Sequence, residues 1–324
     1  MVILGVRLHK SKVGIAERSR ILYSQEMIIR ELREGEWDLL AEMIFNSTND
    51  WYRRNLNRAC FPGDDSSGCR IFPEVYEALD PGCCFVAEIE GEIAGSCFYH
   101  RRESHLSLGI MNASAKFTGQ GVAKRLLAEV IDRAEGLSVR LVSSVMNLDS
   151  YSLYTRMGFV PTALFQDMYF PEGKLMPLSD LEVREAELRD VDDLVELEEE
   201  ISGIRRRKDL VHFIENEAGI WRGYVHEAGG EIRGFLFSVD HPGSRMLGPG
   251  VMRDDEVAAA LIARALVDYD GASPLMLIPA QGGLVQRLYD RGARNCELHV
   301  AQQFGGKVEA PNGIVIPTFM PETG

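Results

Sequence analysis

Two glycines one residue apart, Gly119 and Gly121, precede a helix-forming stretch in KFTGQGVAKRLL, residues 116–127. Val122, Leu126 and Val130 recur at helical spacing, which predicts an amphipathic helix that begins near Gly121. The first turn of a helix carries unpaired N–H groups and the positive end of the helix dipole, and glycine lets an anion approach the backbone. The stretch therefore suits a phosphate or diphosphate group. The alternative is a tight turn without a ligand.

Three basic side chains, Lys116, Lys124 and Arg125, lie around this helix start in a chain with a formal net charge of −14. The local contrast favours an anion site, and the alternative is a solvated basic face. The negative charge of the whole chain opposes binding to nucleic acid and to anionic lipid. It favours a cationic or amine-bearing small molecule.

A second helix is predicted in NLDSYSLYTRMGF, residues 147–159, after the strand-like stretch VRLVSSVMN. Leu153, Tyr154 and Met157 share one face of this helix, and Gly158 stands where a C-terminal cap belongs. Upstream of the first helix, HLSLGIM alternates as a strand. Two strand–helix units therefore follow one another.

Length and composition limit the classes of protein. With 324 residues the chain exceeds the usual size of one hydrophobic core, and 45% hydrophobic and 26% charged residues are typical of globular proteins. No apolar run approaches the roughly 18 residues of a membrane span, so we expect no membrane segment, no signal peptide and a cytoplasmic protein. The six cysteines and seven histidines lack metal-ligand spacing, so we expect reduced thiols and no metal site.

The chain contains an internal repeat. EIEGEIAGSCF (88–98) and HEAGGEIRGFLF (226–237) both predict strand, glycine turn and strand, and they match at an offset of 139 residues. IRELREGEWDLLAEM (29–43) resembles VREAELRDVDDLVEL (183–197) at an offset of 154. Each copy is expected to run as strand, helices, hairpin, strand, helix, strand, helix and strand, which gives an α/β fold with a mixed sheet.

This repeat predicts a domain organisation. We expect an N-terminal appendage at 1–26, a first domain at 27–172 and a second at 173–324, joined near PEGKLMPLSD. The variable region 47–82 holds the residues expected to shape an acceptor pocket, although they suit a core equally well: Trp51, Tyr52, Cys60, Phe61 and Phe72.

In order and spacing, the glycine loop and the later helix resemble the GNAT superfamily of acetyl-CoA-dependent N-acyltransferases. The pyrophosphate loop of that family reads Arg/Gln-x-x-Gly-x-Gly/Ala, and here it runs from Thr118 through Gly121 to Ala123. The family helix reads Asn-x-x-Ala-x-x-Leu-Tyr-x-x-x-Gly-Phe, and here it runs from Asn147 to Phe159. The resemblance covers about residues 28–165. It implies two GNAT-like domains, each a mixed, mostly antiparallel sheet that splays after its fourth strand and is flanked by helices.

The resemblance also implies which residues bind acetyl-CoA. They are Met111, Asn112, Ala113, Thr118, Gly119, Gln120, Gly121, Val122, Ala123, Lys124, Asn147 and Ser150. Thr118 stands where the family usually has Arg or Gln; its hydroxyl can cap the helix, but a charged arm to the anion is missing. Asn147 either contacts the coenzyme through its amide or is an ordinary turn residue.

The reaction that the family implies is direct attack of an amine on the acetyl thioester. Tyr154 matches the family position for the acid that protonates the thiolate, with core packing as the alternative. A backbone N–H near Met111 or Asn112 is the candidate donor to the oxyanion. Position alone suggests Glu103 and His105 as the catalytic base, with a solvated hairpin and a water relay as alternatives.

The second copy lacks both the glycine loop before the helix and the tyrosine of the later helix. At the offset of 139, Gly119 and Gly121 align with Ala258 and Ala260, and the acidic residues 254–256 would repel a diphosphate. We expect a degenerate GNAT-like domain that completes a pseudo-dimer and walls the acceptor pocket.

Three further features of the second copy bear on this expectation. Aligning Gly292 with the capping glycine of the first copy places Leu288 at the tyrosine position, whereas residues 248–250 stay unexplained and leave room for another ligand. The charge runs ELEEE (196–200) and RRRK (205–208) are expected to be solvated helix faces.

The sequence thus favours an N-acetyltransferase that uses acetyl-CoA and acts on a small-molecule amine, without nucleic acid or membrane as partner. It is expected to be a monomer with an internal pseudo-dimer, or a homodimer. The alternatives are a non-catalytic acyl-CoA-binding sensor or interaction protein, and an aminoacyl transferase, for which the chain lacks the basic surface that tRNA needs.

Overall fold

The computed structural model describes residues 26–171, 182–269 and 273–322, and most of the expected appendage and linker lies outside these ranges. The N-terminal half contains, in chain order, β1 (Met27–Glu31), α1 (Trp37–Leu56), α2 (Ile71–Leu79), β2 (Cys84–Ile89), β3 (Glu92–Arg101), β4 (His105–Ala113), α3 (Val122–Arg133), β5 (Ser138–Ser144), α4 (Leu148–Arg156) and β6 (Val160–Tyr169). This is the order of elements that the sequence predicts.

The C-terminal half repeats that order and adds one strand. It contains β7 (Val183–Glu185), α5 (Val191–Ser202), α6 (Arg207–Glu215), β8 (Trp221–Ala228), β9 (Glu231–His241), β10 (Ser244–Met252), α7 (Asp255–Leu266), β11 (Leu275–Pro279), α8 (Leu284–Asp290), β12 (Arg294–Phe304) and β13 (Ile314–Ile316). The mixed α/β fold with flanking helices is therefore confirmed.

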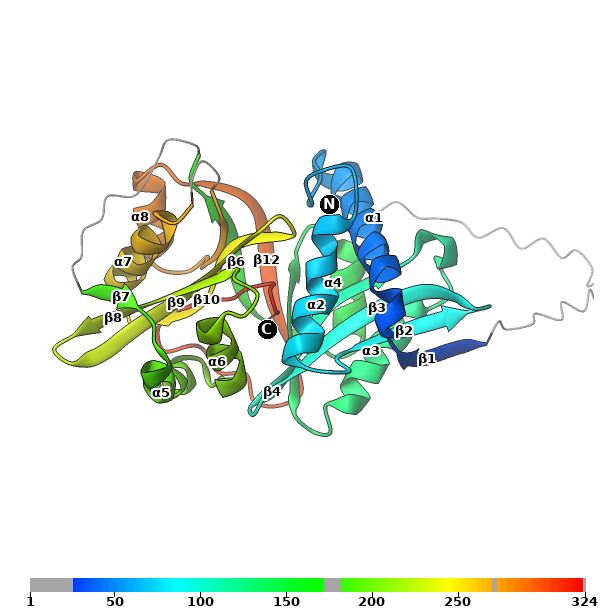
Figure 1. The fold of residues 1–324 in the computed structure, drawn as a ribbon, viewed down its shortest axis with the longest axis horizontal. Coiled ribbons are helices and arrows are strands. Elements are labelled where there is room, and N and C mark those ends of the chain that lie inside the picture. The colour runs from blue at the N-terminus through cyan, green and yellow to red at the C-terminus, as the bar shows by residue number, and fades with distance from the viewer. Residues whose placement is uncertain (1–25, 172–181, 270–272, 323–324) are drawn as a thin grey trace, which may run out of the picture.

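The two halves exchange strands within one sheet. Its order is β1-β2-β3-β4-β5-β12-β6-β11-β10-β9-β8-β7. β12 of the C-terminal half lies antiparallel between β5 and β6, and β6 pairs in turn with β11. β6 and β12 run side by side between the halves in Figure 1. Each half therefore completes the sheet of the other.

The sheet splays after the fourth strand of each half, as the resemblance implied. β4 and β5 pair in parallel only over residues 105–107 and 138–140 and then separate. β10 and β11 pair only at Met246 and Leu247. The two openings differ, because β13 lies in the second one and pairs antiparallel with residues 250–252 of β10.

Helices cover both faces of the sheet. Side chains of α1, α2, α5 and α6 share one apolar cluster with Phe98 of β3 and Phe237 of β9. Neighbouring strand residues point to opposite faces, and Cys97 accordingly packs in a second cluster with α3 and α4. A third cluster holds α7 and α8 on the sheet, with Leu236 of β9. No helix within the described ranges is long and apolar enough to cross a bilayer.

The expectation that the charge runs at 196–200 and 205–208 are solvated faces holds for Glu196, Glu199, Glu200 and Arg207, which are exposed, but it is wrong for Glu198 and Arg206. Arg206 is 1% exposed and Glu198 is fully buried, and the Arg206 Nε donates to both carboxylate oxygens of Glu198 at 2.9 and 3.0 Å. A buried guanidinium needs such a paired carboxylate to offset its desolvation. The two runs therefore hold α5 and the start of α6 together.

The same basic run links the two halves. Lys208 forms an ion pair with Asp80, which follows α2. Arg102, which follows β3, pairs with Asp209 of α6, with 2.6 Å between Nη2 and Oδ2 and both side chains fully buried. These contacts fix α6 against the N-terminal half.

Candidate active site

A cleft of about 450 Å³ lies in the opening between β4 and β5. Its walls come from α1, the end of β4, the end of β5, the start of α3, α4, β12 and the segment that follows β13. Half of the residues expected to bind acetyl-CoA line it, namely Met111, Asn112, Ala113, Ala123, Asn147 and Ser150. The others, Thr118, Gly119, Gln120, Gly121, Val122 and Lys124, form the adjoining loop and the first turn of α3 and do not line the cleft.

The start of α3 is built by glycine, as the sequence predicts. Gly121 is the N-cap of α3 with φ 79°, and Gly119 has φ 81°, so both occupy the left-handed region that other residues enter at a cost. A Cβ added at either glycine would meet nothing within 4 Å. The backbone at these two glycines is therefore open on the side where a Cβ would stand.

The side chains of this loop differ from expectation in one respect. The Thr118 hydroxyl does not cap α3; it donates to the carbonyl of Ala115 at 2.8 Å, because Thr118 ends a short 3-10 turn. Lys116 is paired with Glu92. Within the part of the chain that the structure describes, Lys124 forms no ion pair, so its charge is available near the first turn of α3.

The start of α4 is capped by Asn147, whose Oδ1 accepts a hydrogen bond from the Ser150 N–H at 3.1 Å. This hydrogen bond satisfies one of the free N–H groups of the first turn. Asn147 also lines the cleft. Its structural role in the turn is therefore confirmed, whereas a contact with a coenzyme stays a prediction.

Tyr154 lies on the inner face of α4, lines the cleft and is 7% exposed. Its ring packs against Phe159 with 5.9 Å between centroids. Among the described residues none hydrogen-bonds its hydroxyl. Burial raises the pKa of the Tyr154 phenol, so the hydroxyl stays protonated at neutral pH and can donate a proton or a hydrogen bond.

Glu103 and His105 are not brought to the cleft. They lie at the opposite end of β4, and neither lines the cleft or the pocket described next. Glu103 is exposed and accepts a hydrogen bond from the Arg207 N–H at 3.3 Å. His105 is fully buried, with its ring nitrogens 2.9 and 3.0 Å from the hydroxyls of Ser104 and Ser107. Both side chains therefore serve the contact between the halves and the local packing.

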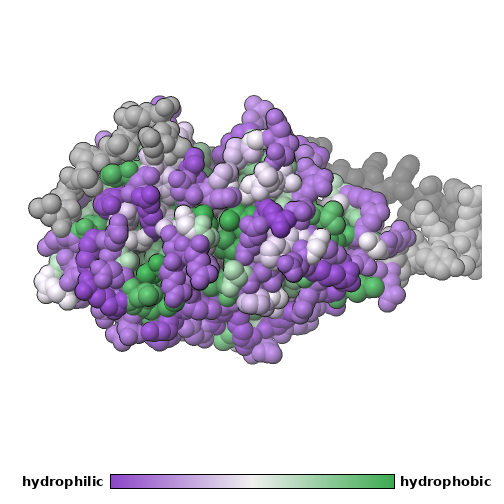
Figure 2. Space-filling model, viewed as in Figure 1, coloured by the Kyte–Doolittle hydropathy of each residue, from purple (hydrophilic) through white to green (hydrophobic). Residues whose placement is uncertain are grey.

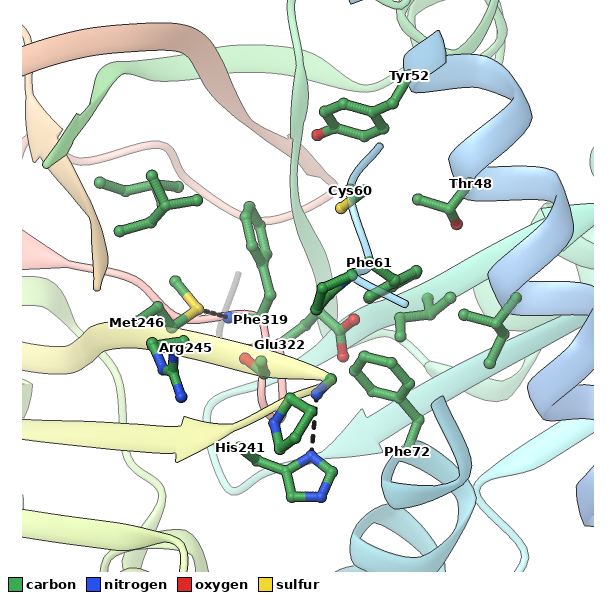
Figure 3. A pocket seen from close by; sticks show the side chains of 18 of the residues that line it. Thr48, Tyr52, Cys60, Phe61, Phe72, His241, Arg245, Met246, Phe319 and Glu322 are labelled. Atoms are coloured by element: carbon green, nitrogen blue, oxygen red, sulfur yellow. Dashed lines mark hydrogen bonds between the residues drawn. The ribbon is translucent and has the colours of Figure 1, made fainter. Parts of the chain in front are cut away.

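An apolar pocket of about 440 Å³ adjoins the cleft. Its lining comes from α1 and α2, the loop after α1, the β9–β10 turn, β11, and the segment 317–322 that follows β13. Figure 3 shows Phe319 and Glu322 between the side chains of α1 and those of β10. Figure 2 shows apolar side chains at the surface where the halves meet, and further apolar patches elsewhere on the same face. Four of the five residues expected to shape an acceptor pocket line it, namely Tyr52, Cys60, Phe61 and Phe72.

The cleft and the apolar pocket meet at five residues that line both: Thr48, Tyr52, Ile110, Phe319 and Glu322. Sequence reasoning missed Glu322, since it follows the last element of the second repeat and belongs to no motif. Burial raises the pKa of its carboxyl to about 8, against the opposing effect of the Arg102 charge. Its Oε2 is buried without a hydrogen-bond partner in the described residues, 3.8 Å from Nε2 of His100.

The equivalent site in the C-terminal half is closed at the helix start. The alignment of Gly119 and Gly121 with Ala258 and Ala260 is wrong, since these alanines lie inside α7. The N-cap of α7 is Asp254, and its Oδ1 accepts from the N–H groups of residues 256 and 257, both at 3.0 Å. A carboxylate therefore occupies the position where a phosphate would bind.

The splay of the C-terminal half is closed as well. At the offset of 139, residues 250–252 correspond to 111–113, and they pair with β13 instead of leaving an open edge. Gly248 permits this, because a Cβ there would lie 2.4 Å from the carbonyl oxygen of Pro317. Leu288 is fully buried at the tyrosine position, as expected. The previously unexplained residues 248–250 thus accommodate the chain's own strand.

Comparisons with known proteins agree with this geometry. The model of the Acetyltransferase (GNAT) family matches residues 49–159, and that of the Acetyltransferase (GNAT) domain matches residues 194–302. Among curated proteins, none matches the sequence significantly.

Several solved structures share the fold over both halves. A putative acetyltransferase from Pyrococcus horikoshii is 19% identical with a TM-score of 0.70, covering 92% of this chain and 98% of that one. A GCN5-related N-acetyltransferase from Sphaerobacter thermophilus is 16% identical with a TM-score of 0.60, covering 88% and 98%. A tandem GNAT protein from the clavulanic acid biosynthesis pathway is 12% identical with a TM-score of 0.57, covering 88% and 100%. The chain therefore belongs to the GNAT superfamily and contains two GNAT domains in tandem.

Proposed function

We propose that the N-terminal half transfers an acetyl group from acetyl-CoA to the primary amine of a small molecule. The observation that carries this proposal is the open splay between β4 and β5, beside a glycine-built helix start. The corresponding opening of the C-terminal half holds β13 and the Asp254 carboxylate. One acetyl-CoA is thus expected per chain.

The residues around the cleft suit the parts of acetyl-CoA. The first-turn N–H groups of α3 and the charge of Lys124 favour its diphosphate. The unpaired edge of β4 at residues 111–113 offers N–H and C=O groups to the pantetheine amides. The thioester would then lie in the part of the cleft that Tyr154 lines, toward the junction with the apolar pocket.

The proposed reaction needs no intermediate bound to the protein. The neutral amine attacks the thioester carbon, and the C–N bond forms while the carbonyl becomes an oxyanion. A backbone N–H of β4 near Met111 donates to that oxyanion. The C–S bond then breaks, and the Tyr154 hydroxyl protonates the thiolate.

The test combines calorimetry of coenzyme A binding with mass spectrometry of amines incubated with acetyl-CoA. Gly121→Ala is expected to weaken coenzyme binding at least tenfold, because the new methyl group enters the open space at the first turn of α3. Gly229→Ala is the matched control, since Gly229 also has a positive φ, 62°, with nothing within 4 Å, and lies in the β8–β9 turn. Equal coenzyme affinity in both variants would contradict the proposal. Binding without turnover of any amine would favour the acyl-CoA sensor.

A further inference from the structure

We infer that the acceptor is a primary monoamine on an apolar body, seated in the apolar pocket, and that Glu322 receives the proton from its nitrogen. This inference rests on the proposed function. It starts from the five residues that line both cavities, because an acetyl donor in the cleft and an acceptor in the pocket can touch only at that junction.

The lining of the pocket selects the body of the acceptor. Its side chains are largely aliphatic or aromatic, and they include Ile44, Phe61, Phe72, Met246, Leu275 and Leu277. A cavity of about 440 Å³ is large enough for a phenyl ring or a short alkyl chain. Burying such a group contributes about 25 cal/mol per Å² of apolar surface, whereas a polyhydroxylated body would lose hydrogen bonds to water.

The charges of the pocket select a single amine. Among the described lining residues, Glu322 supplies the carboxylate, and it lies at the junction. Arg245 supplies a guanidinium. This side chain is half-exposed, and its Nε donates to Oδ1 of Asp240 at 2.6 Å. Burial lowers the pKa of His241, whose Nδ1 accepts from the Gly243 N–H at 3.0 Å, so this ring is neutral. Glu322 is the one carboxylate among the described lining residues, so a second ammonium on the acceptor would have no carboxylate partner in the pocket.

The carboxyl of Glu322 is held at the junction by its own segment. Tyr76 of α2 donates its hydroxyl to the Phe319 carbonyl at 2.8 Å, and the Phe319 N–H points to Sδ of Met246 at 3.2 Å. The Glu322 Oε2 lies against the strand that forms the cleft wall, 3.1 Å from where a Cβ of Gly109 would stand. Glu322 lines both the cleft and the pocket, and its Oε2 has no hydrogen-bond partner among the described residues. Once ionised, this carboxyl can accept a proton.

Tyr52 is the other ionisable residue at the junction, and it is unsuited to act as the base. Burial raises the pKa of its phenol, so the hydroxyl is protonated at neutral pH. It lies 3.4 Å from Oε1 of Glu297, to which it donates. Glu322 is therefore the group at the junction that can accept a proton.

The proton balance follows from these positions. As the C–N bond forms, the nitrogen gains a positive charge and passes one proton to the Glu322 carboxylate, leaving a neutral amide product. The thiolate that departs takes a proton from Tyr154. Glu322 and Tyr154 then return to their starting forms through exchange of one proton with water.

This role makes turnover depend on the ionisation of Glu322. The titratable groups that face it are Tyr76 of α2, Cys83 before β2, and Cys97, His100 and Arg102 on or after β3. Arg102 opposes the rise of the Glu322 pKa, and burial lowers the pKa of His100, which keeps its ring neutral. The rate is therefore expected to rise with pH through about 8, as the carboxylate forms.

The experiment measures kcat/KM of the full chain with acetyl-CoA and three amines: n-hexylamine, 2-phenylethylamine and spermidine. The wild type is expected to prefer the two apolar monoamines at least tenfold over spermidine. Glu322→Gln is expected to lower kcat about 100-fold with unchanged affinity for coenzyme A, and to lose the rise near pH 8. Leu275→Gln, in the pocket wall, is expected to raise KM for hexylamine with kcat little changed. Glu256→Gln, an exposed residue of α7, is the matched control.

Every other outcome of this experiment contradicts one part of the inference or the proposed function beneath it. Preference for spermidine would overturn the class of acceptor while acetyl transfer stands. A Glu322→Gln kcat within threefold of the wild type would overturn the role of Glu322. If that variant fails to fold, Glu322→Asp and the pH profile of the wild type decide, and a profile without a rise near pH 8 contradicts the inference. A wild type that binds no coenzyme A would refute the proposed function itself.

Discussion

Tyr154 belongs to the helix motif predicted from the sequence and lines the cleft in the structure. Its ring is buried against Phe159, and its hydroxyl has no hydrogen-bond partner among the described residues. Tyr154→Phe is expected to lower kcat about 100-fold, since the thiolate would depart unprotonated. Coenzyme affinity is expected to stay within twofold, measured by calorimetry. Tyr151→Phe, on the same helix but outside the cleft, is the control, and equal rates for both variants would contradict a role for Tyr154.

Glu322 also allows a prediction about stability that does not depend on activity. Its carboxyl has a pKa of about 8 in the folded chain and about 4.5 when unfolded, so the folded state holds the proton more tightly. The stability that this proton contributes is complete below pH 4.5 and is lost as the pH rises to 8. The slope is about 1.4 kcal/mol per pH unit. Glu322→Gln is expected to remove it, as measured by urea unfolding at pH 5 to 9, and parallel curves for both proteins would contradict the burial of a protonated carboxyl.

Some residues of the site could be predicted because neighbouring residues in the sequence determine their role, and others could not because distant contacts determine it. Gly121 and Asn147 were predictable, because helix starts and caps depend on a few neighbouring residues. Glu103 and His105 were chosen for their place at the start of a strand, but the opening lies at the other end of that strand. Glu322 was beyond prediction, since its burial and raised pKa depend on side chains that lie more than 200 positions away in the sequence, such as Tyr76 and His100.

At the scale of elements, β13 fills the opening of the C-terminal half and leads into the segment that holds Glu322. Ile316 is fully buried and pairs with Gly250, and the segment after it continues to Phe319 and Glu322. Ile316→Ala is expected to cost about 2–5 kcal/mol of stability and to lower kcat as well, because the segment that holds Glu322 loses its anchor.

A matched control separates these two effects. Leu266→Ala, in α7 and the same apolar cluster, is expected to lose similar stability but to keep its kcat at a temperature where both variants are folded. Unfolding and steady-state kinetics measure the two quantities. A similar fall in kcat for both variants would show that general destabilisation, and not the position of Glu322, limits turnover.

The repeat predicted the order of elements but could not predict β13. Its three residues have no counterpart in the first copy, and from the sequence residues 248–250 stayed unexplained and left room for another ligand. The pairing of β13 with β10 shows what fills this opening, where Gly248 makes room for the carbonyl of Pro317. Local propensity contains no information about which distant strand fills an opening.

At the scale of the whole molecule, the exchange of β6 and β12 makes the halves interdependent. β12 supports β5, which is one wall of the cleft, so the second domain is part of the site although its own cleft is closed. Two similar copies in the sequence indicated two domains. They did not indicate the exchange, because a strand has the same hydrophobic pattern whether it pairs within its own half or with the other.

The buried pair of Arg102 and Asp209 provides a test of this interdependence. Asp209→Ala is expected to destabilise the chain by about 3–5 kcal/mol, since it leaves the Arg102 guanidinium buried without its partner. Thermal unfolding measures the loss. The double variant Arg102→Met/Asp209→Leu is expected to recover most of it, and failure to recover would point to a contact of these side chains other than the ion pair.

Residues 314–322 seal one opening and supply the proton acceptor at the edge of the other. If residues 314–322 moved away to admit acetyl-CoA to the C-terminal cleft, the Glu322 carboxyl would move with them. The N-terminal cleft would then lose its proposed proton acceptor. The two clefts are thus mutually exclusive as catalysts, and selection for a second active centre in this protein would have to provide a new base for the first.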